Sequence, residues 1–359
     1  MAEKKARNSN LEILRIVSML LIILAHYAGH GGIIDQATAA GGHFLGLCLK
    51  TGGKLGVVCF VLISTYFMCE QKFKFEALLK TLLQATFYAL LVFVILLLSG
   101  QSVGMGTAVK SLFAVFLGNY WFVAAYLGMY LFQPLLKKIT DSLDMEKSMT
   151  VTVMMALVFT VIPFAFGNVT FVTSNLAYFC FLFFVGNHLR KYPVRPKLLD
   201  SFPLVVCLIS AALIPVSAFV IEQVLKGHPD AAARYHFIFY DLNSPLMLLA
   251  GIGLFLCFVR RKPTVQPLIN KFAANMFGVY LLHDNIYVRH FLWHKLLRID
   301  SVYDKNVLVI LGHALLCSAV IMVCASLVET VRRIPEKWLM QTAPVKKLCA
   351  YCNARYSEI

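Results

Sequence analysis

The sequence predicts an all-α integral membrane protein with about ten transmembrane helices and both termini in the cytosol. Hydrophobic residues make up 59% of the 359 residues and charged residues only 14%, which is more apolar surface than a soluble domain can bury. The apolar residues fall into runs of roughly 15 to 25, the length that crosses a bilayer with some tilt. The net charge of +15 comes from lysines and arginines between these runs rather than from a basic arm with interleaved aromatic residues, so we exclude nucleic acid as a partner.

Ten apolar segments are expected to cross the membrane, and the second, sixth and eighth of them are short. In chain order they are Leu11–Gly29, Leu55–Cys69, Ala77–Leu98, Leu112–Leu136, Met149–Phe166, Asn175–Leu189, Phe202–Val224, Ser244–Val259, Phe272–His290 and Val307–Val328. With the N-terminus inside, most of the 33 lysines and arginines lie on the inner side, as cytosolic loops require. We therefore expect one membrane domain over residues 8–333 and a short cytosolic tail over residues 334–359.

The first segment carries two ionisable residues that lipid does not tolerate without a reason. Arg15 and His26 are eleven positions apart, so on a helix they share one face and lie about 16 Å apart along the axis. Ser9-x-x-Glu12 has the pattern of a capping box that starts such a helix. Taken alone, Arg15 fits a side chain that reaches the cytosolic headgroups, and His26 fits the opposite interface. The pair at this spacing favours a site inside a helix bundle.

His26 is the candidate general base for a hydroxyl group, because a buried histidine stays neutral near pH 7 and can accept a proton. Asp35, nine residues further on, is the candidate to orient the imidazole if the turn at Gly31 and Gly32 folds back; the alternative is a solvated loop acid. His26 and His30 also have the i, i+4 spacing of a zinc-binding pair. No third ligand follows at a suitable spacing, so no metal is expected.

Four further residues are candidates for substrate binding: Ser64, Trp121, Tyr126 and His283. His283 lies within the ninth segment with Asp284 beside it, and two adjacent ionisable groups at that depth are costly unless they line a cavity. The alternative for His283 is a structural hydrogen bond to a neighbouring helix. Trp121 and Tyr126, together with Tyr130, fit either a wall for a sugar ring or anchors at the membrane surface. Ser64 fits either a hydrogen-bond donor or a small residue that lets helices pack closely.

Five sequence blocks in order resemble the motifs of a known family. The first is LEILRIVSMLLIILAHYAGHGG, in which ten residues separate Arg15 from His26. The others are GVVCFVLISTYFM from Gly56, NYWFVAAYLGMYLFQPLL from Asn119, YDLNSPLMLL from Tyr240 and FGVYLLHDN from Phe277. On these blocks the chain is similar to the acyltransferase 3 family of membrane acyltransferases over roughly residues 8 to 333.

The resemblance implies an O-acyltransferase in a bacterial plasma membrane. It would move an acyl group, most commonly acetyl from acetyl-CoA, onto a hydroxyl of a cell-surface polysaccharide or its lipid-linked precursor. Arg15 and Lys80 are then the candidates to meet the phosphates or pantetheine amide of CoA from the cytosol, while His26 acts at the outer mouth. The chain departs from the family in two places. Thr65 stands where the family often has glycine, and Lys80 stands alone where an arginine pair is often found.

Two other classes of function stay open at this level. A transporter or flippase for a glycan or a small solute would line its path with Arg15, His26 and His283, although the paired and broken repeats common in transporters are not evident. A membrane sensor or binding module is the third class. Dependence on acyl-CoA separates the enzyme from both.

Overall fold

The computed structural model describes residues 7–100, 104–117, 120–166, 174–194, 196–228, 230–231 and 235–356. Helices account for 80% of the structure and the described part of the chain contains no β-strand, which confirms the predicted all-α membrane class. The longer helices are α1 (Ser9–Gly29), α3 (Gly42–Met68), α4 (Phe75–Leu98), α6 (Trp121–Leu131), α8 (Met145–Ala156), α10 (Asn175–Lys191), α12 (Pro203–Val224), α14 (Pro245–Val259), α17 (Val307–Leu339) and α18 (Ala343–Tyr356). The shorter ones are α2 (Ile33–Gln36), α5 (Met105–Leu112), α7 (Gln133–Asp141), η1 (Leu157–Val161), α9 (Ile162–Phe166), α11 (Lys197–Ser201), η2 (Ile238–Tyr240), α15 (Pro267–Ala273), α16 (Met276–His283), η3 (Phe291–Leu296) and η4 (Ile299–Val302).

Among the described residues, seven helical stretches are long and apolar enough to cross a membrane. They correspond to the predicted first, second, third, fifth, seventh, eighth and tenth segments. The other three predicted segments contain α6, α10 and α16, which have only 11, 17 and 8 residues, so the count of ten crossings stays a prediction. α17 continues unbroken past residue 333, and the boundary predicted there therefore falls inside a helix.

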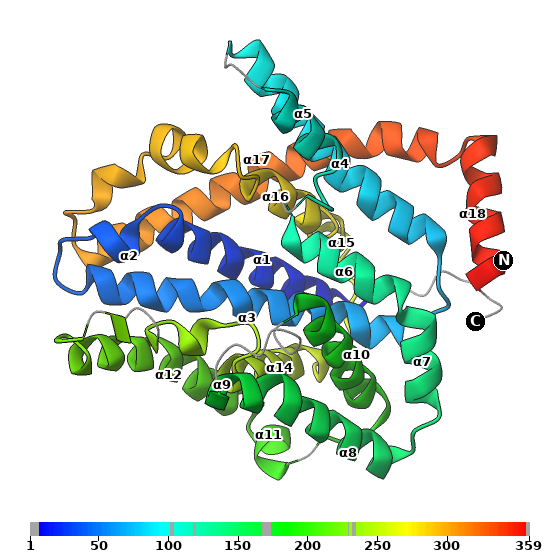
Figure 1. The fold of residues 1–359 in the computed structure, drawn as a ribbon, viewed down its shortest axis with the longest axis horizontal. Helices are drawn as coiled ribbons and strands as arrows, with labels where there is room; N and C mark the ends of the chain where they lie inside the picture. Colours follow the sequence, from blue (N-terminus) through cyan, green and yellow to red (C-terminus); the bar gives the residue numbers. More distant parts are fainter. Residues whose placement is uncertain are drawn as a thin grey trace.

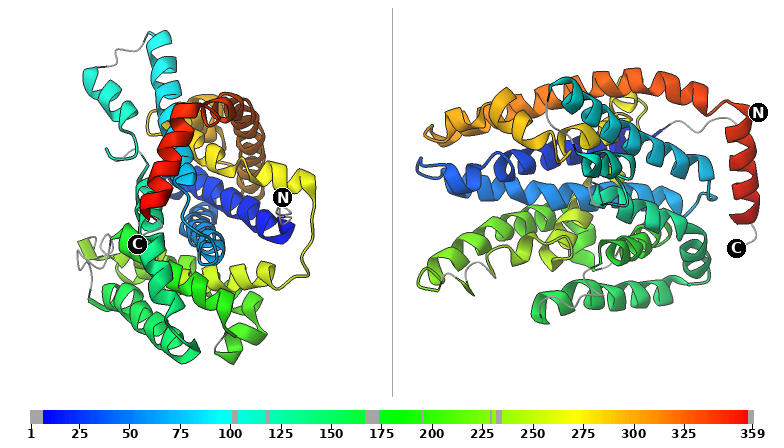
Figure 2. Two further views of the ribbon diagram at one scale, coloured as in Figure 1. Left: turned by 90° about the vertical axis from the view of Figure 1, so that its right-hand side faces the viewer. Right: turned by 45° about the horizontal axis from the view of Figure 1, so that its top comes forward.

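The helices lie in three layers, with α1 and α3 in the middle (Figures 1 and 2). On one side of this pair lie α16, α17 and α4, and on the other lie α8, α10, α12 and α14. Among the described helices, α1 and α3 make the most extensive contact with each other. Residues on the first helix are therefore enclosed by several other helices, as the Arg15 and His26 pattern predicts.

Two glycines of α3 set how closely α1 and α3 approach. A Cβ atom on Gly52 would lie 2.7 Å from the carbonyl oxygen of Leu21, and one on Gly56 would lie 2.5 Å from the carbonyl oxygen of Ser18. The spacing of four residues places both glycines on one face of the helix, which is the small-residue pattern of closely packed membrane helices. This contact fixes the register between α1 and the polar residues of α3.

The prediction that the second segment begins at Leu55 is wrong, because α3 starts at Gly42. The stretch GHFLGLCLKTGGKLG has the glycines and lysines of a loop, yet it is helical throughout. Gly52, Gly53 and Gly56 pack against α1, and the side chains of Lys50 and Lys54 line a cavity. Tertiary contacts therefore overrode the local composition.

The predicted fourth and ninth segments are each interrupted. α6 ends at Leu131 and α7 begins at Gln133, with Pro134 in its first turn; proline has no N–H to continue the preceding helix. In the ninth segment, α15 and α16 are separated at Asn275, whose side-chain amide donates to the carbonyl oxygen of Ser326, 3.2 Å away. Short helices and irregular backbone at membrane depth are tolerated where they line a cavity.

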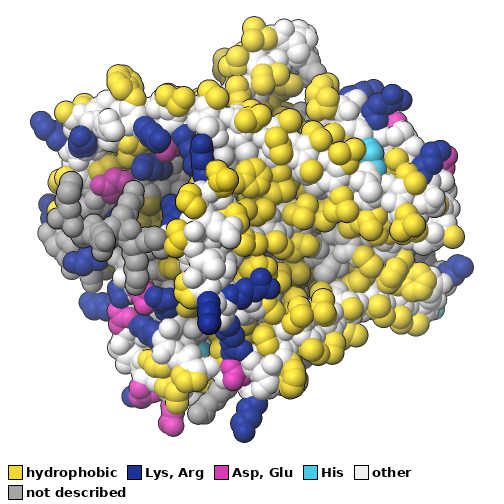
Figure 3. All heavy atoms as spheres, turned by 180° about the vertical axis from the view of Figure 1, so that it is seen from behind, with side chains coloured by type: hydrophobic (Ala, Val, Ile, Leu, Met, Phe, Trp, Pro, Cys, Tyr) yellow, Lys and Arg dark blue, Asp and Glu magenta, His cyan; other side chains and the backbone are white. Residues whose placement is uncertain are grey.

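The described ends of the chain lie at the same end of the bundle (Figure 1). There the backbone N–H of Phe75 donates to the Asn353 side chain over 2.7 Å, and the ring of Tyr356 stacks on Phe73 with centroids 4.2 Å apart. Figure 3 shows apolar side chains over the middle of the rear face and many lysines and arginines toward this same end. We call this the inner end and the opposite end, which carries α2, the outer end. Assignment of the inner end to the cytosol stays a prediction.

Candidate active site

The outer half of the bundle encloses a cavity of about 250 Å³ between α1, α3, α6 and α16. Its lining is mostly apolar, with a few polar side chains: His26, His30, Lys50, Lys54, Trp121, Tyr240, Tyr280 and Asp284. We call it the outer cavity. An apolar pocket with a small number of convergent polar groups is the usual form of a binding site for a small molecule.

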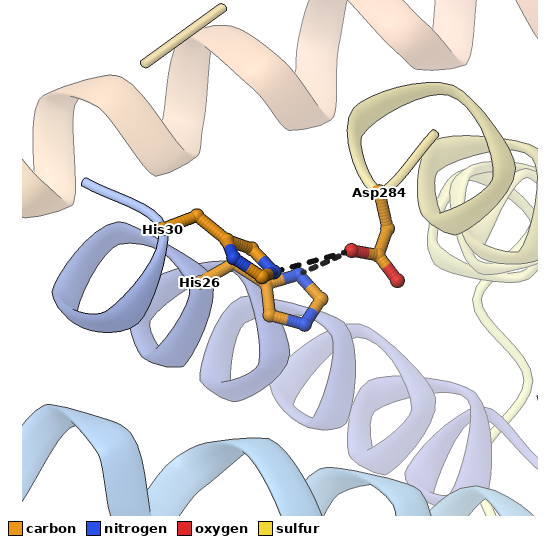
Figure 4. A group of neighbouring side chains, drawn as sticks. All are labelled: His26, His30 and Asp284. Atoms are coloured by element: carbon orange, nitrogen blue, oxygen red, sulfur yellow. Dashed lines mark ion pairs between the residues drawn. The ribbon is translucent and has the colours of Figure 1, made fainter. Parts of the chain in front are cut away.

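His26, His30 and Asp284 point toward one another at one side of this cavity (Figure 4). The two histidines are one helical turn apart on α1, whereas Asp284 caps the C-terminal end of α16. The Oδ1 atom of Asp284 lies 3.6 Å from Nδ1 of His26 and 3.6 Å from Nε2 of His30. A carboxylate at this distance stabilises an imidazole that takes up a proton.

A second histidine fixes the tautomer of His26. The Nδ1 atom of His283 lies 2.7 Å from the carbonyl oxygen of Val279, so we assign it the proton that it donates there. The Nε2 atom of His283 is then an acceptor, and it lies 3.0 Å from Nδ1 of His26, which must donate. The remaining nitrogen of His26, Nε2, keeps its lone pair. His26 is therefore held as the tautomer that can accept a proton from a substrate.

The loop that carries Asp284 is fixed by polar contacts on both sides. Arg289 pairs with the Asp284 carboxylate, with Nη2 2.7 Å from Oδ1. The next residue, Asn285, donates to the hydroxyl of Tyr120 over 2.9 Å, and that hydroxyl donates to the carbonyl oxygen of Leu281. Asp284 and Asn285 are 2% and 0% exposed, so these contacts compensate the burial of both side chains.

The predicted orienting residue, Asp35, lies away from His26. It is exposed on α2, and the nearby groups on which its charge acts include His43, Lys50 and His236. The turn after α1 leads directly into α2, whose N-cap is Gly32. The carboxylate beside His26 is supplied instead by Asp284, 249 positions further along the chain than Asp35. The sequence held one signal for it, the adjacent ionisable pair in YLLHDN, but no spacing rule connects that pair to α1.

His26, His30 and Asp284 also satisfy the distance requirement of a metal site, since one ligand atom from each lies within 4.8 Å of the others. The third ligand that the sequence did not reveal is therefore present. However, two of the three ligand atoms already have protein partners: His283 on Nδ1 of His26 and Arg289 on Oδ1 of Asp284. A guanidinium on the same oxygen opposes a cation there, so the arrangement favours acid–base chemistry. The absence of a metal stays a prediction.

A second cavity of about 710 Å³ lies in the inner half of the bundle, and we call it the inner cavity. Its cationic residues are Arg7, Arg15, Lys80, Arg332, Arg333 and Lys337, and Glu336 is its one acidic lining residue among those described. Arg15 and Lys80, both predicted to meet the donor phosphates, therefore face the same space. A cavity with this excess of positive charge suits a polyanion.

Two buried carboxylates, Glu12 and Glu329, hold three arginines of the inner cavity in place. Glu12 pairs with Arg15 one turn away on α1; it does not close the predicted capping box, since Asn8 caps this helix and Ser9 donates to Asn270. On α17, the fully buried Glu329 accepts from Arg332 and Arg333, and from the hydroxyl of Tyr88 over 2.9 Å. Arginines braced in this way are pre-organised for further contacts at little cost in entropy.

Three phenylalanines, Phe60, Phe122 and Phe277, line both cavities. The two cavities therefore meet at an aromatic boundary inside the bundle. Arg15 lies on the inner side of this boundary and His26 on the outer side, which is the division that the sequence pattern predicts for the two ends of the first helix.

The predicted substrate-binding residues divide between the two cavities. Trp121 lines the outer cavity, whereas Ser64 and Tyr126 line the inner one, so Trp121 and Tyr126 do not form a single wall. His283 is 2% exposed and contacts His26 rather than the cavity. His283 therefore makes a structural hydrogen bond to a neighbouring helix, which was the alternative prediction. Its partner there is the candidate base, His26.

Sequence reasoning missed Tyr280, which lines the outer cavity three residues before His283. Its hydroxyl is buried and has no hydrogen-bond partner within the described residues. An unpaired buried hydroxyl costs about 1–3 kcal/mol unless a ligand satisfies it. Its position in YLLHDN was visible in the sequence, but a tyrosine in an apolar helix carries no signal of its own.

The fold and the site together define a multi-pass helical membrane protein with two internal cavities and a candidate acid–base centre in the outer one. A family model described as an acyltransferase domain matches residues 8–329 of the chain. The chain therefore belongs to the acyltransferase 3 family and is a membrane acyltransferase. Neither a search of curated protein sequences nor a search of solved structures gave a significant match.

Proposed function

We propose that this enzyme takes an acyl group, most simply acetyl, from acyl-CoA in the inner cavity and transfers it to a glycan hydroxyl in the outer cavity. One observation carries the proposal: a basic cavity and a histidine-containing cavity share the boundary formed by Phe60, Phe122 and Phe277. The donor is a polyanion from the cytosol, and the acceptor lies on the other side of the membrane. Only the acyl group has to cross the boundary.

The reaction needs one base that later returns its proton. As the acceptor oxygen attacks the thioester carbonyl carbon, its proton moves to Nε2 of His26, and Asp284 stabilises the imidazolium that forms. The tetrahedral intermediate then collapses, the carbon–sulfur bond breaks, and the CoA sulfur takes the proton from His26. The products are the ester and free CoA. The unpaired hydroxyl of Tyr280 supports a role as hydrogen-bond donor to the oxyanion.

The inner cavity contains an arginine pair that replaces the pair often found in the family at the position where this chain has only Lys80. Arg332 and Arg333 are adjacent on α17, and both line the cavity with Arg15 and Lys80. We assign the phosphates of CoA to this set of cations, because guanidinium groups bind phosphate oxygens in bidentate fashion. Ser64 and Tyr126 then lie on the side of the pantetheine arm, where a hydroxyl can contact its amides.

The acceptor belongs to the outer surface: a cell-surface polysaccharide or its lipid-linked precursor, in a bacterial plasma membrane. Support comes from the family and from the outer cavity, which lies on the other side of the aromatic boundary from the basic inner cavity. Trp121 at this cavity offers an aromatic face of the kind that sugars pack against.

The test is proton NMR of surface polysaccharide from cells that carry the wild-type protein, the His26→Ala variant or a gene deletion. The matched control is His290→Ala, which changes an exposed histidine at the outer end. Immunoblots verify that the protein variants are present in the membrane at equal levels. We expect an O-acyl signal with wild type and His290→Ala, and its loss in His26→Ala and the deletion. An intact signal in all four strains, with reduced polysaccharide export in the deletion, would instead support a transporter.

A further inference from the structure

Two lysines of α3, Lys50 and Lys54, line the outer cavity beside the acid–base centre. Both belong to a helix long and apolar enough to cross the membrane, and they are spaced i, i+4 on one face. Two ammonium groups at this spacing repel each other. Ionisable side chains at membrane depth mark binding sites or ion paths when they face a cavity.

Within the described residues, neither lysine has a carboxylate within ion-pair distance. Each instead lies over an aromatic ring: the Nζ atom of Lys54 is 4.2 Å from the ring centroid of Trp121, and that of Lys50 is 4.0 Å from Phe237. A cation–π contact recovers only a small part of the hydration free energy that an ammonium loses when it is withdrawn from water. The rings therefore compensate the burial of these charges only in part.

The remaining charges around the cavity do not offset the two lysines. Asp284 already pairs with Arg289, whose Nη2 lies 2.7 Å from its Oδ1, and it acts on Lys54 only from beyond ion-pair distance. Asp35 and Asp241 act on the lysines only from beyond ion-pair distance. The cavity thus keeps excess positive charge on the wall facing His26.

We propose that Lys50 and Lys54 bind a carboxylate of the substrate, so that the outer cavity selects an acidic acyl group or an acidic sugar. The inference rests on the proposed function and names the substrate class of that site. A carboxylate matches two point-like ammonium groups: it has one charge and two acceptor oxygens. Held there, it positions the reacting part of the substrate within the same cavity of about 250 Å³ that His26 lines. The carboxylate comes from either a dicarboxylic acyl group or a uronic-type sugar of the acceptor.

The test uses the full-length protein in cells that make the native surface glycan. Lys54→Gln removes the charge and Lys54→Arg keeps it, and Lys50→Gln is a second variant of the first kind. Lys295→Gln, an exposed lysine of the outer end, is the matched control. Immunoblots equalise membrane levels, and NMR with mass spectrometry of the released glycan identifies the acyl group and the sugar that carries it.

We expect the acylated unit to contain a carboxylate, and methylene signals of a half-ester or the signals of a uronate tell the two sources apart. Acylation should fall at least about tenfold in Lys54→Gln and Lys50→Gln, stay within a few-fold of wild type in Lys54→Arg, and be unchanged in Lys295→Gln. A neutral acyl group on a neutral sugar would overturn the inference, as would a phosphate as the only anion or full acylation in Lys54→Gln. If His26→Ala abolishes acylation while Lys54→Gln does not, only the carboxylate inference fails. If the wild type and the deletion give the same spectrum, the proposed function itself fails.

Discussion

The imidazole of His283 lies between the carbonyl oxygen of Val279 and the imidazole of His26, with contacts of 2.7 Å and 3.0 Å. This chain of hydrogen bonds allows only one neutral arrangement: His283 donates to the carbonyl, and His26 donates to His283. It leaves the other nitrogen of His26 unprotonated in the outer cavity. His283 thereby acts as a positioning residue for the base.

The first prediction concerns this positioning role. His283→Ala should reduce kcat by about 10²-fold or more while leaving the KM for acyl-CoA unchanged, because general-base catalysis contributes about that much and the donor site is elsewhere. His283→Gln, whose amide oxygen can accept from His26, should restore part of the rate. Release of free CoA thiol by membrane vesicles, measured over a range of pH, checks both variants. A raised KM with unchanged kcat would show that His283 binds substrate instead.

The second prediction concerns the cations of the inner cavity. Arg15→Ala and Lys80→Gln should each weaken acyl-CoA binding several-fold, and the loss should shrink at high salt because screening already weakens these contacts. Binding of a fluorescent acyl-CoA analogue to purified protein at two salt concentrations is the measurement. Lys295→Gln at the outer end is the control. Unchanged affinity in Arg15→Ala would place the donor somewhere else.

The third prediction concerns the buried cluster on α17. Arg332→Met should destabilise the protein by about 3 kcal/mol, because it leaves the fully buried Glu329 with fewer partners. Tyr88→Phe, which removes one hydrogen bond to Glu329, should cost only about 1 kcal/mol. Thermal unfolding in detergent compares the two. Equal melting temperatures for Arg332→Met and wild type would contradict the burial of this charge.

The fourth prediction concerns the contact between α1 and α3. Gly56→Ala places a methyl group against the carbonyl oxygen of Ser18, so it should destabilise the protein by about 1–3 kcal/mol and lower activity by shifting His26. Gly312→Ala on α17 is a matched control, since a Cβ atom there meets nothing within 4 Å. Unfolding temperature and acyl transfer should be measured on both variants. An equally stable and active Gly56→Ala variant would show that the two helices can separate without consequence.

The fifth prediction concerns metals at His26, His30 and Asp284. We expect dialysis against a strong chelator to leave acyl transfer and the unfolding temperature unchanged, because protein side chains already hold the ligand atoms of His26 and Asp284. Elemental analysis of the purified protein provides an independent readout. A stoichiometric metal whose removal lowers stability would replace the acid–base interpretation.

Hydropathy and composition alone determined the membrane class, most of the long helices and the division of the first helix between a basic inner end and a histidine at the outer end. Each of these features can be deduced from a single helix without knowledge of its neighbours. The thickness of the bilayer sets the length of a membrane helix, and the helical repeat sets which residues share a face. The resemblance of the five blocks added the family, which the family model confirms.

Only the tertiary structure decided which groups meet His26. Asp284 and His283 come from a helix end more than 250 positions away, and Asp35, the nearer candidate by sequence, lies elsewhere. The loop-like stretch with Lys50 and Lys54 is helical, with Gly52, Gly53 and Gly56 packed against α1 and both lysines lining a cavity. Contacts between distant segments depend on how the helices pack, and no local pattern in the chain encodes that packing.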